Sequence, residues 1–137
     1  MTDITTVAPR GAMVSAARIY WLIVATIGTA SFLMSCTISM TQEGNGGALN
    51  GLWFTLSYFT VWSNIVTFIA TWMLVADPQR DGRGFRWFRM TSLVMITVTG
   101  LVYAIVLAAD AHPIGLGVYT NIGYHYITPW ATLLGFL

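Results

Sequence analysis

The stretch that decides the fold is "LWFTLSYFTVWSNIVTFIATWMLVA", which runs from Leu52 to Ala76. It contains no charged residue, and it is long enough for a helix to cross a bilayer, which takes about 20 consecutive apolar residues. It also lacks the strict alternation of polar and apolar residues that is typical of a membrane β-strand. Because backbone groups in lipid must be satisfied within the segment itself, the stretch predicts a membrane-spanning helix.

The composition of the whole chain supports this interpretation. Its 137 residues allow one small domain, with 56% hydrophobic and only 8% charged residues. A soluble domain has about 25% charged residues. The single cysteine, Cys36, excludes an internal disulfide, and the net charge of +1 gives no indication of a nucleic-acid partner.

Other apolar runs lie on either side of this stretch, separated by short polar segments. We expect a short N-terminal segment over residues 1–18 and a transmembrane domain over 19–137, with spans at about 19–40, 52–76, 91–109 and 121–137. The predicted fold is therefore an all-α, polytopic transmembrane helix bundle. The fourth run is short for a span, so the sequence predicts an incomplete fourth span in a chain truncated at its C-terminus.

The arginines predict the orientation. Arg10 and Arg18 precede the first run, and the four others, Arg80, Arg83, Arg86 and Arg89, follow the second. Positively charged segments stay on the cytoplasmic side, so we expect a cytoplasmic N-terminus and outer loops near residues 44–48 and 110–117.

Polar residues inside the second run follow a helical pattern. Their spacing of three or four residues predicts one polar face that points into the bundle, formed by Ser57, Thr60, Asn64, Thr67 and Thr71. Ser63 lies off this face. Helix packing explains most of these residues, because small polar side chains allow close approach. For Thr60 and Asn64, packing and a functional role both remain open.

His125 is the one ionisable side chain, apart from tyrosine, inside a predicted span. Such residues are functional candidates, although His125 could also be a helix-end residue at the membrane interface. The second and fourth runs enter from the same side, so Thr60 and His125 are expected in the same half of the bilayer. A hydroxyl beside an imidazole is a minimal nucleophile–base pair.

Cys36 allows a competing interpretation of the first run. Arginine, an apolar run and then "LMSC", Leu33 to Cys36, loosely match a lipoprotein signal with Cys36 as the lipidated residue. Met34 fits that signal poorly, and lipoproteins rarely carry three further spans, so a transmembrane helix is the preferred interpretation.

Three blocks in the sequence resemble a known family. "YFTVWSN" (58–64), "VTGLVYAIVL" (98–107) and "NIGYHYITPWATLLGFL" (121–137) occur in the order found in bacterial Pr6Pr-type integral membrane proteins. These are distant relatives of the eukaryotic androgen-induced membrane proteins, which hydrolyse fatty acid esters. The resemblance implies six spans in a bacterial inner membrane, and a catalytic threonine and histidine that correspond best to Thr60 and His125.

Two functions remain open at this point. The first is hydrolysis of lipid or fatty acid esters, with Thr60 as nucleophile, His125 as base and Asn64 in support, and with no metal or cofactor. Its partners would be the lipid bilayer and a lipid ester. The second is a non-enzymatic membrane protein, either a small-molecule binder or a transporter-like subunit, whose polar face lines a cavity.

Overall fold

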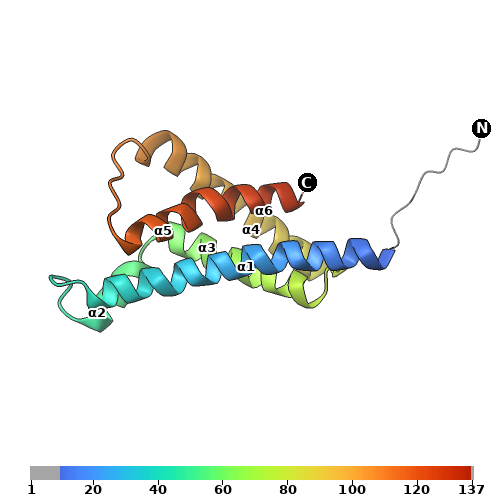
Figure 1. Cartoon of the computed structure of the whole chain (residues 1–137), viewed down its shortest axis with the longest axis horizontal. Coiled ribbons are helices and arrows are strands. Elements are labelled where there is room, and N and C mark those ends of the chain that lie inside the picture. Colours follow the sequence, from blue (N-terminus) through green and yellow to red (C-terminus); the bar gives the residue numbers. More distant parts are fainter. Residues whose placement is uncertain (1–9, 137) are drawn as a thin grey trace, which may run out of the picture.

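The computed structural model describes residues 10–136, and every regular element among them is helical. Helix α1 is long and runs beside α3 and α6, while α2 and α5 lie at one end (Figure 1). The elements are α1 (Arg10–Thr41), α2 (Ala48–Leu56), α3 (Phe59–Ala76), α4 (Arg83–Val102), η1 (Tyr103–Leu107), α5 (Leu116–Ile122), η2 (Gly123–Ile127) and α6 (Thr128–Phe136). The expected all-α fold is confirmed.

Three helices of the described chain are long and apolar enough to cross a membrane: Arg10–Thr41, Phe59–Ala76 and Arg83–Leu107. The fourth expected span, 121–137, lies in a helical segment that starts earlier, at Leu116, and is divided into α5, η2 and α6. That segment is not among the three, so a fourth span stays a prediction.

The first helix is longer than the sequence indicates. Helix α1 begins at Arg10, so residues 10–18 are helical rather than a separate segment. Residues 1–9 of the expected N-terminal segment lie outside the described residues. Cys36 lies half-buried inside α1, and its lipidation stays a prediction.

The second run is not one helix but two, and a side chain explains the break. In a continuous helix the Leu56 carbonyl would accept the Thr60 N–H, but here it accepts the indole N–H of Trp62 at 2.8 Å. Tyr58 adopts an extended conformation with φ −87° and ψ 131°. The chain therefore ends α2 at Leu56 and starts α3 at Phe59, within a stretch that the apolar pattern predicts to be continuous.

Part of the expected arginine-rich loop is also helical. Helix α4 begins at Arg83, so the connection from α3 covers only residues 77–82. The Arg86 guanidinium donates to both carboxylate oxygens of Asp81, at 2.6 and 2.5 Å, which joins this loop to the first turn of α4. The apolar pattern places the start of the third helix too late. The first turns of α4 carry arginines, and a charged segment of this kind is read from the sequence as a loop.

Small residues allow the helices to pack closely. A Cβ added at Gly100 of α4 would lie 2.7 Å from the Cβ of Pro129 in α6, and one at Gly123 would overlap the Ser31 hydroxyl of α1. The last helix is further held at its end, where the Tyr20 hydroxyl donates to the Ala131 carbonyl at 2.5 Å. These contacts place the segment 116–136 between α1 and α4.

Candidate functional site

The sequence predicts five inward-facing polar residues on one face of the second run, and the structure buries three of them. Asn64, Thr67 and Thr71 are fully buried. Ser57 is exposed, because it lies at the break before α3 and is not on that helix. Ser63, which the sequence places off this face, is also fully buried, and its hydroxyl is 2.7 Å from that of Thr99 in α4.

Most hydroxyls on α3 are hydrogen-bonded within their own helix. Ser63 donates to the Thr60 carbonyl, Thr67 to the Ser63 carbonyl and Thr71 to the Phe68 carbonyl, at 2.7–2.9 Å. This bonding suits a packing role. Asn64 donates its amide to the Thr60 carbonyl at 2.9 Å, while its Oδ1 is buried without a hydrogen-bond partner in the described chain.

Thr60 differs from its neighbours on α3. It lies in the first turn and is half-buried, and neither its hydroxyl nor its backbone N–H makes a hydrogen bond within residues 10–136. The N–H is free because the extended backbone at Tyr58 interrupts the helical ladder, and the Leu56 carbonyl accepts the indole N–H of Trp62 instead. The break therefore leaves Thr60 with two unoccupied hydrogen-bonding groups at the positive end of the α3 dipole.

Thr60 lines a pocket of about 210 Å³ between α3 and α4, which we call the Thr60 pocket. Most of its lining is apolar or aromatic, and four of the lining residues carry a hydroxyl. The lining residues are Tyr58, Phe59, Thr60, Val98, Thr99, Val102, Tyr103 and Leu107.

His125 lines a second pocket, of about 270 Å³, which we call the His125 pocket. The imidazole is half-buried, and its Nδ1 is enclosed without a hydrogen-bond partner in the described chain. The other lining residues come from α1, from the connection after η1 and from α5: Ser35, Ile38, Ser39, Pro113, Gly117, Thr120 and Asn121.

The two pockets meet at an aromatic stack. The buried ring of Tyr103, part of the wall of the Thr60 pocket, stacks on the imidazole of His125 with centroids 3.8 Å apart and planes 14° apart. Each of these two residues lies in a π-helical turn, η1 or η2. Such turns are rare and occur frequently at functional sites.

Thr60 therefore shares its pocket with Tyr103, and the ring of Tyr103 contacts His125. Neither the Thr60 pocket nor the His125 pocket is lined by both Thr60 and His125. The sequence predicts that they share one half of the bilayer, but not that they line separate pockets. The stacking of the Tyr103 ring on His125 is a contact that the apolar pattern of the sequence does not reveal.

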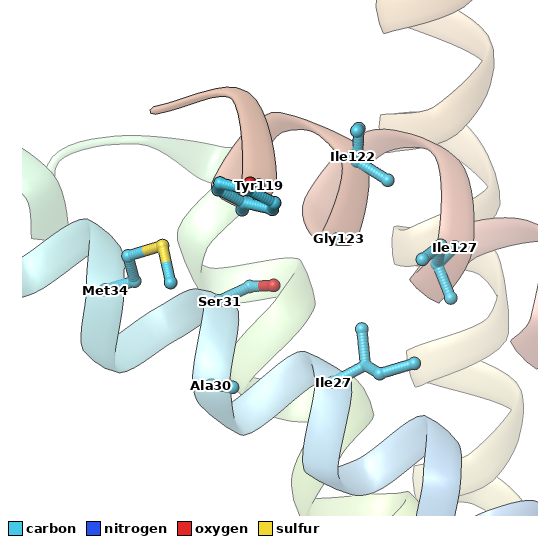
Figure 2. Close-up of a pocket in the computed structure, with 8 residues that line it drawn as sticks. All are labelled: Ile27, Ala30, Ser31, Met34, Tyr119, Ile122, Gly123 and Ile127. Carbon is cyan, nitrogen blue, oxygen red and sulfur yellow. The ribbon is translucent and has the colours of Figure 1, made fainter. Parts of the chain in front are cut away.

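A third pocket, of about 210 Å³, lies between α1 and the segment formed by α5 and η2. Figure 2 shows Ile27 and Met34 on α1 opposite Tyr119, Ile122 and Ile127. Its lining is mostly apolar, with hydroxyls from Ser31 and Tyr119 only. Among residues 10–136 there is also no cluster of three histidine, cysteine, aspartate or glutamate residues that could hold a metal ion.

Comparison with known proteins gives no match to a family model, a curated protein or a solved structure. The family resemblance of the three sequence blocks therefore stays a hypothesis, and the function is argued from the site.

Proposed function

We propose that this chain is a multi-pass membrane protein that hydrolyses lipid or fatty acid esters, with Thr60 as nucleophile and His125 as base. The observation that carries the proposal is the break between α2 and α3. It leaves the Thr60 hydroxyl and N–H without partners, at a helix N-terminus that lines a largely apolar pocket.

This arrangement suits acyl transfer for two reasons. A helix N-terminus stabilises negative charge, and the ester carbonyl oxygen becomes negative as a nucleophile attacks. The N–H of Thr60 would supply a hydrogen bond to that oxygen. Asn64 supports the site by donating to the Thr60 carbonyl, which fixes the first turn of α3.

In the proposed reaction the Thr60 oxygen attacks the ester carbonyl carbon, and His125 takes the threonine proton. The bond from the carbonyl carbon to the alcohol oxygen breaks, and the alcohol leaves with the proton from His125. Water then attacks the acyl-threonine, gives one proton to His125 and releases the fatty acid, and Thr60 regains its proton. Since Thr60 and His125 line separate pockets in this structure, proton transfer requires the Tyr103 ring to move or a water to bridge the two residues.

The proposal extends to the setting of the chain. The arginine distribution supports a cytoplasmic N-terminus, and the family resemblance supports a bacterial inner membrane and a bundle of six spans.

The test is hydrolysis of a panel of fluorogenic fatty acid esters by the purified chain in detergent or nanodiscs. Thr60→Val and His125→Phe should each lower kcat by at least a hundredfold, because each removes a group that the reaction requires. Thr37→Val, on the exposed side of α1, is the matched control and should keep wild-type turnover. Equal turnover by wild type and Thr60→Val would refute the assignment.

A second candidate function is non-catalytic binding of a lipid-like small molecule. The observation that favours it is the position of Thr60 and His125 in separate pockets, since a binder needs no contact between nucleophile and base. The same panel separates the two functions: a binder would retain ligand and show no turnover with any ester.

A further inference from the structure

The two pockets at the Tyr103–His125 stack differ in chemistry. Apolar side chains and tyrosine rings make up most of the Thr60 pocket, and its hydrogen-bonding side-chain groups are hydroxyls only. The His125 pocket carries five hydrogen-bonding side chains, from Ser35, Ser39, Thr120, Asn121 and His125. One pocket therefore suits hydrocarbon, and the other suits a polar group.

The hydrogen-bonding side chains lie on two facing segments. Ser35 and Ser39 are one helical turn apart on α1, and Asn121 and His125 are four residues apart on α5 and η2. Hydroxyl and amide groups both donate and accept hydrogen bonds. The pocket thus presents donors and acceptors from two sides, which suits a ligand that carries several hydroxyls.

The position of the His125 pocket suits a lipid headgroup. Ser39 lies near the end of α1 at Thr41, Gly117 lies near the start of α5, and Pro113 belongs to the connection before α5. The pocket therefore lies at an end of the bundle, where an embedded lipid would have its polar part. The apolar Thr60 pocket would receive the acyl chain.

The lack of an arginine in the His125 pocket argues against a phosphate-bearing headgroup as its ligand. No arginine lines the His125 pocket. The arginines in the described chain lie at the start of α1, at the start of α4 and in the connection before α4. A phosphate would find no cation to pair with, whereas a neutral polyol requires none.

We propose that the His125 pocket is the subsite for the alcohol part of the substrate, and that this part is a small neutral polyol of the glycerol type. The substrate class is then a monoacylglycerol, with its ester beside the Tyr103–His125 stack. A volume of about 270 Å³ holds a glycerol unit, since a water takes about 30 Å³. The assignment of this pocket to an alcohol group rests on the proposed hydrolysis.

The experiment measures binding without turnover. The full chain, labelled with ¹³C-histidine, is titrated in micelles with 1-O-octadecylglycerol, an ether that cannot be hydrolysed, and separately with octadecyl methyl ether. The chain has two histidines, so the exposed His112 serves as an internal control. The glycerol ether should shift the His125 signal saturably and leave His112 unchanged, and the methyl ether should leave both unchanged.

Two variants sharpen the result. Asn121→Ala and Ser39→Ala should each weaken binding of the glycerol ether by about tenfold, the effect of losing one or two hydrogen bonds. Thr37→Val, whose hydroxyl bonds to its own helix, should bind as wild type does. An unshifted His125 signal with the glycerol ether, or equal shifts with both ethers, would overturn the proposal. Saturable binding of the glycerol ether without hydrolysis of monoacylglycerol would leave the subsite standing and refute the hydrolase.

Discussion

At the scale of single residues, hydrogen bonding distinguishes Thr60 from its neighbours more clearly than its position does. The spacing on α3 predicts that Asn64 and Thr67 face inward, and both are buried. Spacing does not reveal which hydroxyls bond within their own helix, because that depends on side-chain rotamers and on the nearby break. It also misplaces Ser63, since contact with Thr99 widens the buried face of α3.

The Ser63–Thr99 hydrogen bond should couple α3 to α4. In a double-mutant cycle of Ser63→Ala and Thr99→Val, we expect a coupling free energy of about 0.6 kcal/mol, and at most about 1.7 kcal/mol, because the unfolded chain in a membrane also finds partners. Unfolding by denaturing detergent provides the measurement. A coupling of zero would show that the two hydroxyls do not interact.

At the scale of elements, the break between α2 and α3 depends on Trp62. Trp62→Phe removes the indole donor and with it the hydrogen bond that stabilises the break, so that the Leu56 carbonyl can pair with the Thr60 N–H. We expect amide hydrogen exchange at Thr60 to slow by about tenfold as that bond forms. Trp53→Phe is the matched control, because Trp53 is exposed in α2. Unchanged exchange at Thr60 in Trp62→Phe would mean that other contacts cause the break.

Packing of α4 against α6 should depend on Gly100. Gly100→Ala places a methyl group against the Pro129 ring, which cannot swing away, and should cost about 1–3 kcal/mol in the free energy of unfolding. Gly84→Ala, in the first turn of the same helix, meets no atom within 4 Å and should stabilise the protein by about 0.4–1 kcal/mol. Equal effects of the two substitutions in a denaturation series would contradict this packing.

The start of α4 should respond to acid. The hydrogen bonds from Arg86 lower the pKa of the Asp81 carboxyl below its ordinary value of 3.8. A lowered pKa means that the stabilisation is complete above this ordinary value and is lost as the pH falls through the folded-state pKa. The melting temperature of Asp81→Asn should therefore lie slightly below that of wild type at pH 6, and the difference should vanish in strong acid. A difference that persists in strong acid would assign the effect to another group.

At the scale of the whole molecule, the sequence predicts the fold class well and the element boundaries less well. Long uncharged runs predict helices because lipid leaves the backbone few alternatives. The break after Leu56 and the early start at Arg83 escape prediction for physical reasons. The first depends on a side-chain donor from the next turn, and the second on charged residues that extend a helix beyond its apolar part. The contact of Tyr103 with His125 depends on two π-turns, which no apolar pattern shows.

The arrangement of the connections gives a test of topology. Residues 42–47 and 108–115 lie at one end of the bundle, and residues 77–82 lie at the other (Figure 1). We expect Asn45→Cys, in a background where Cys36 is replaced by Ala, to react with a membrane-impermeant thiol reagent added outside, and Arg83→Cys to remain unlabelled. Labelling of Arg83→Cys and not of Asn45→Cys would reverse the orientation.

The most direct test of the central claim is intact-protein mass spectrometry after brief incubation with p-nitrophenyl decanoate, an activated ester. We predict the addition of one decanoyl group, which peptide mapping places on Thr60 and which is absent in Thr60→Val. Thr67→Val, whose hydroxyl bonds to its own helix, should acylate as wild type does. No adduct on the wild-type protein, or an adduct that persists in Thr60→Val, would contradict the account.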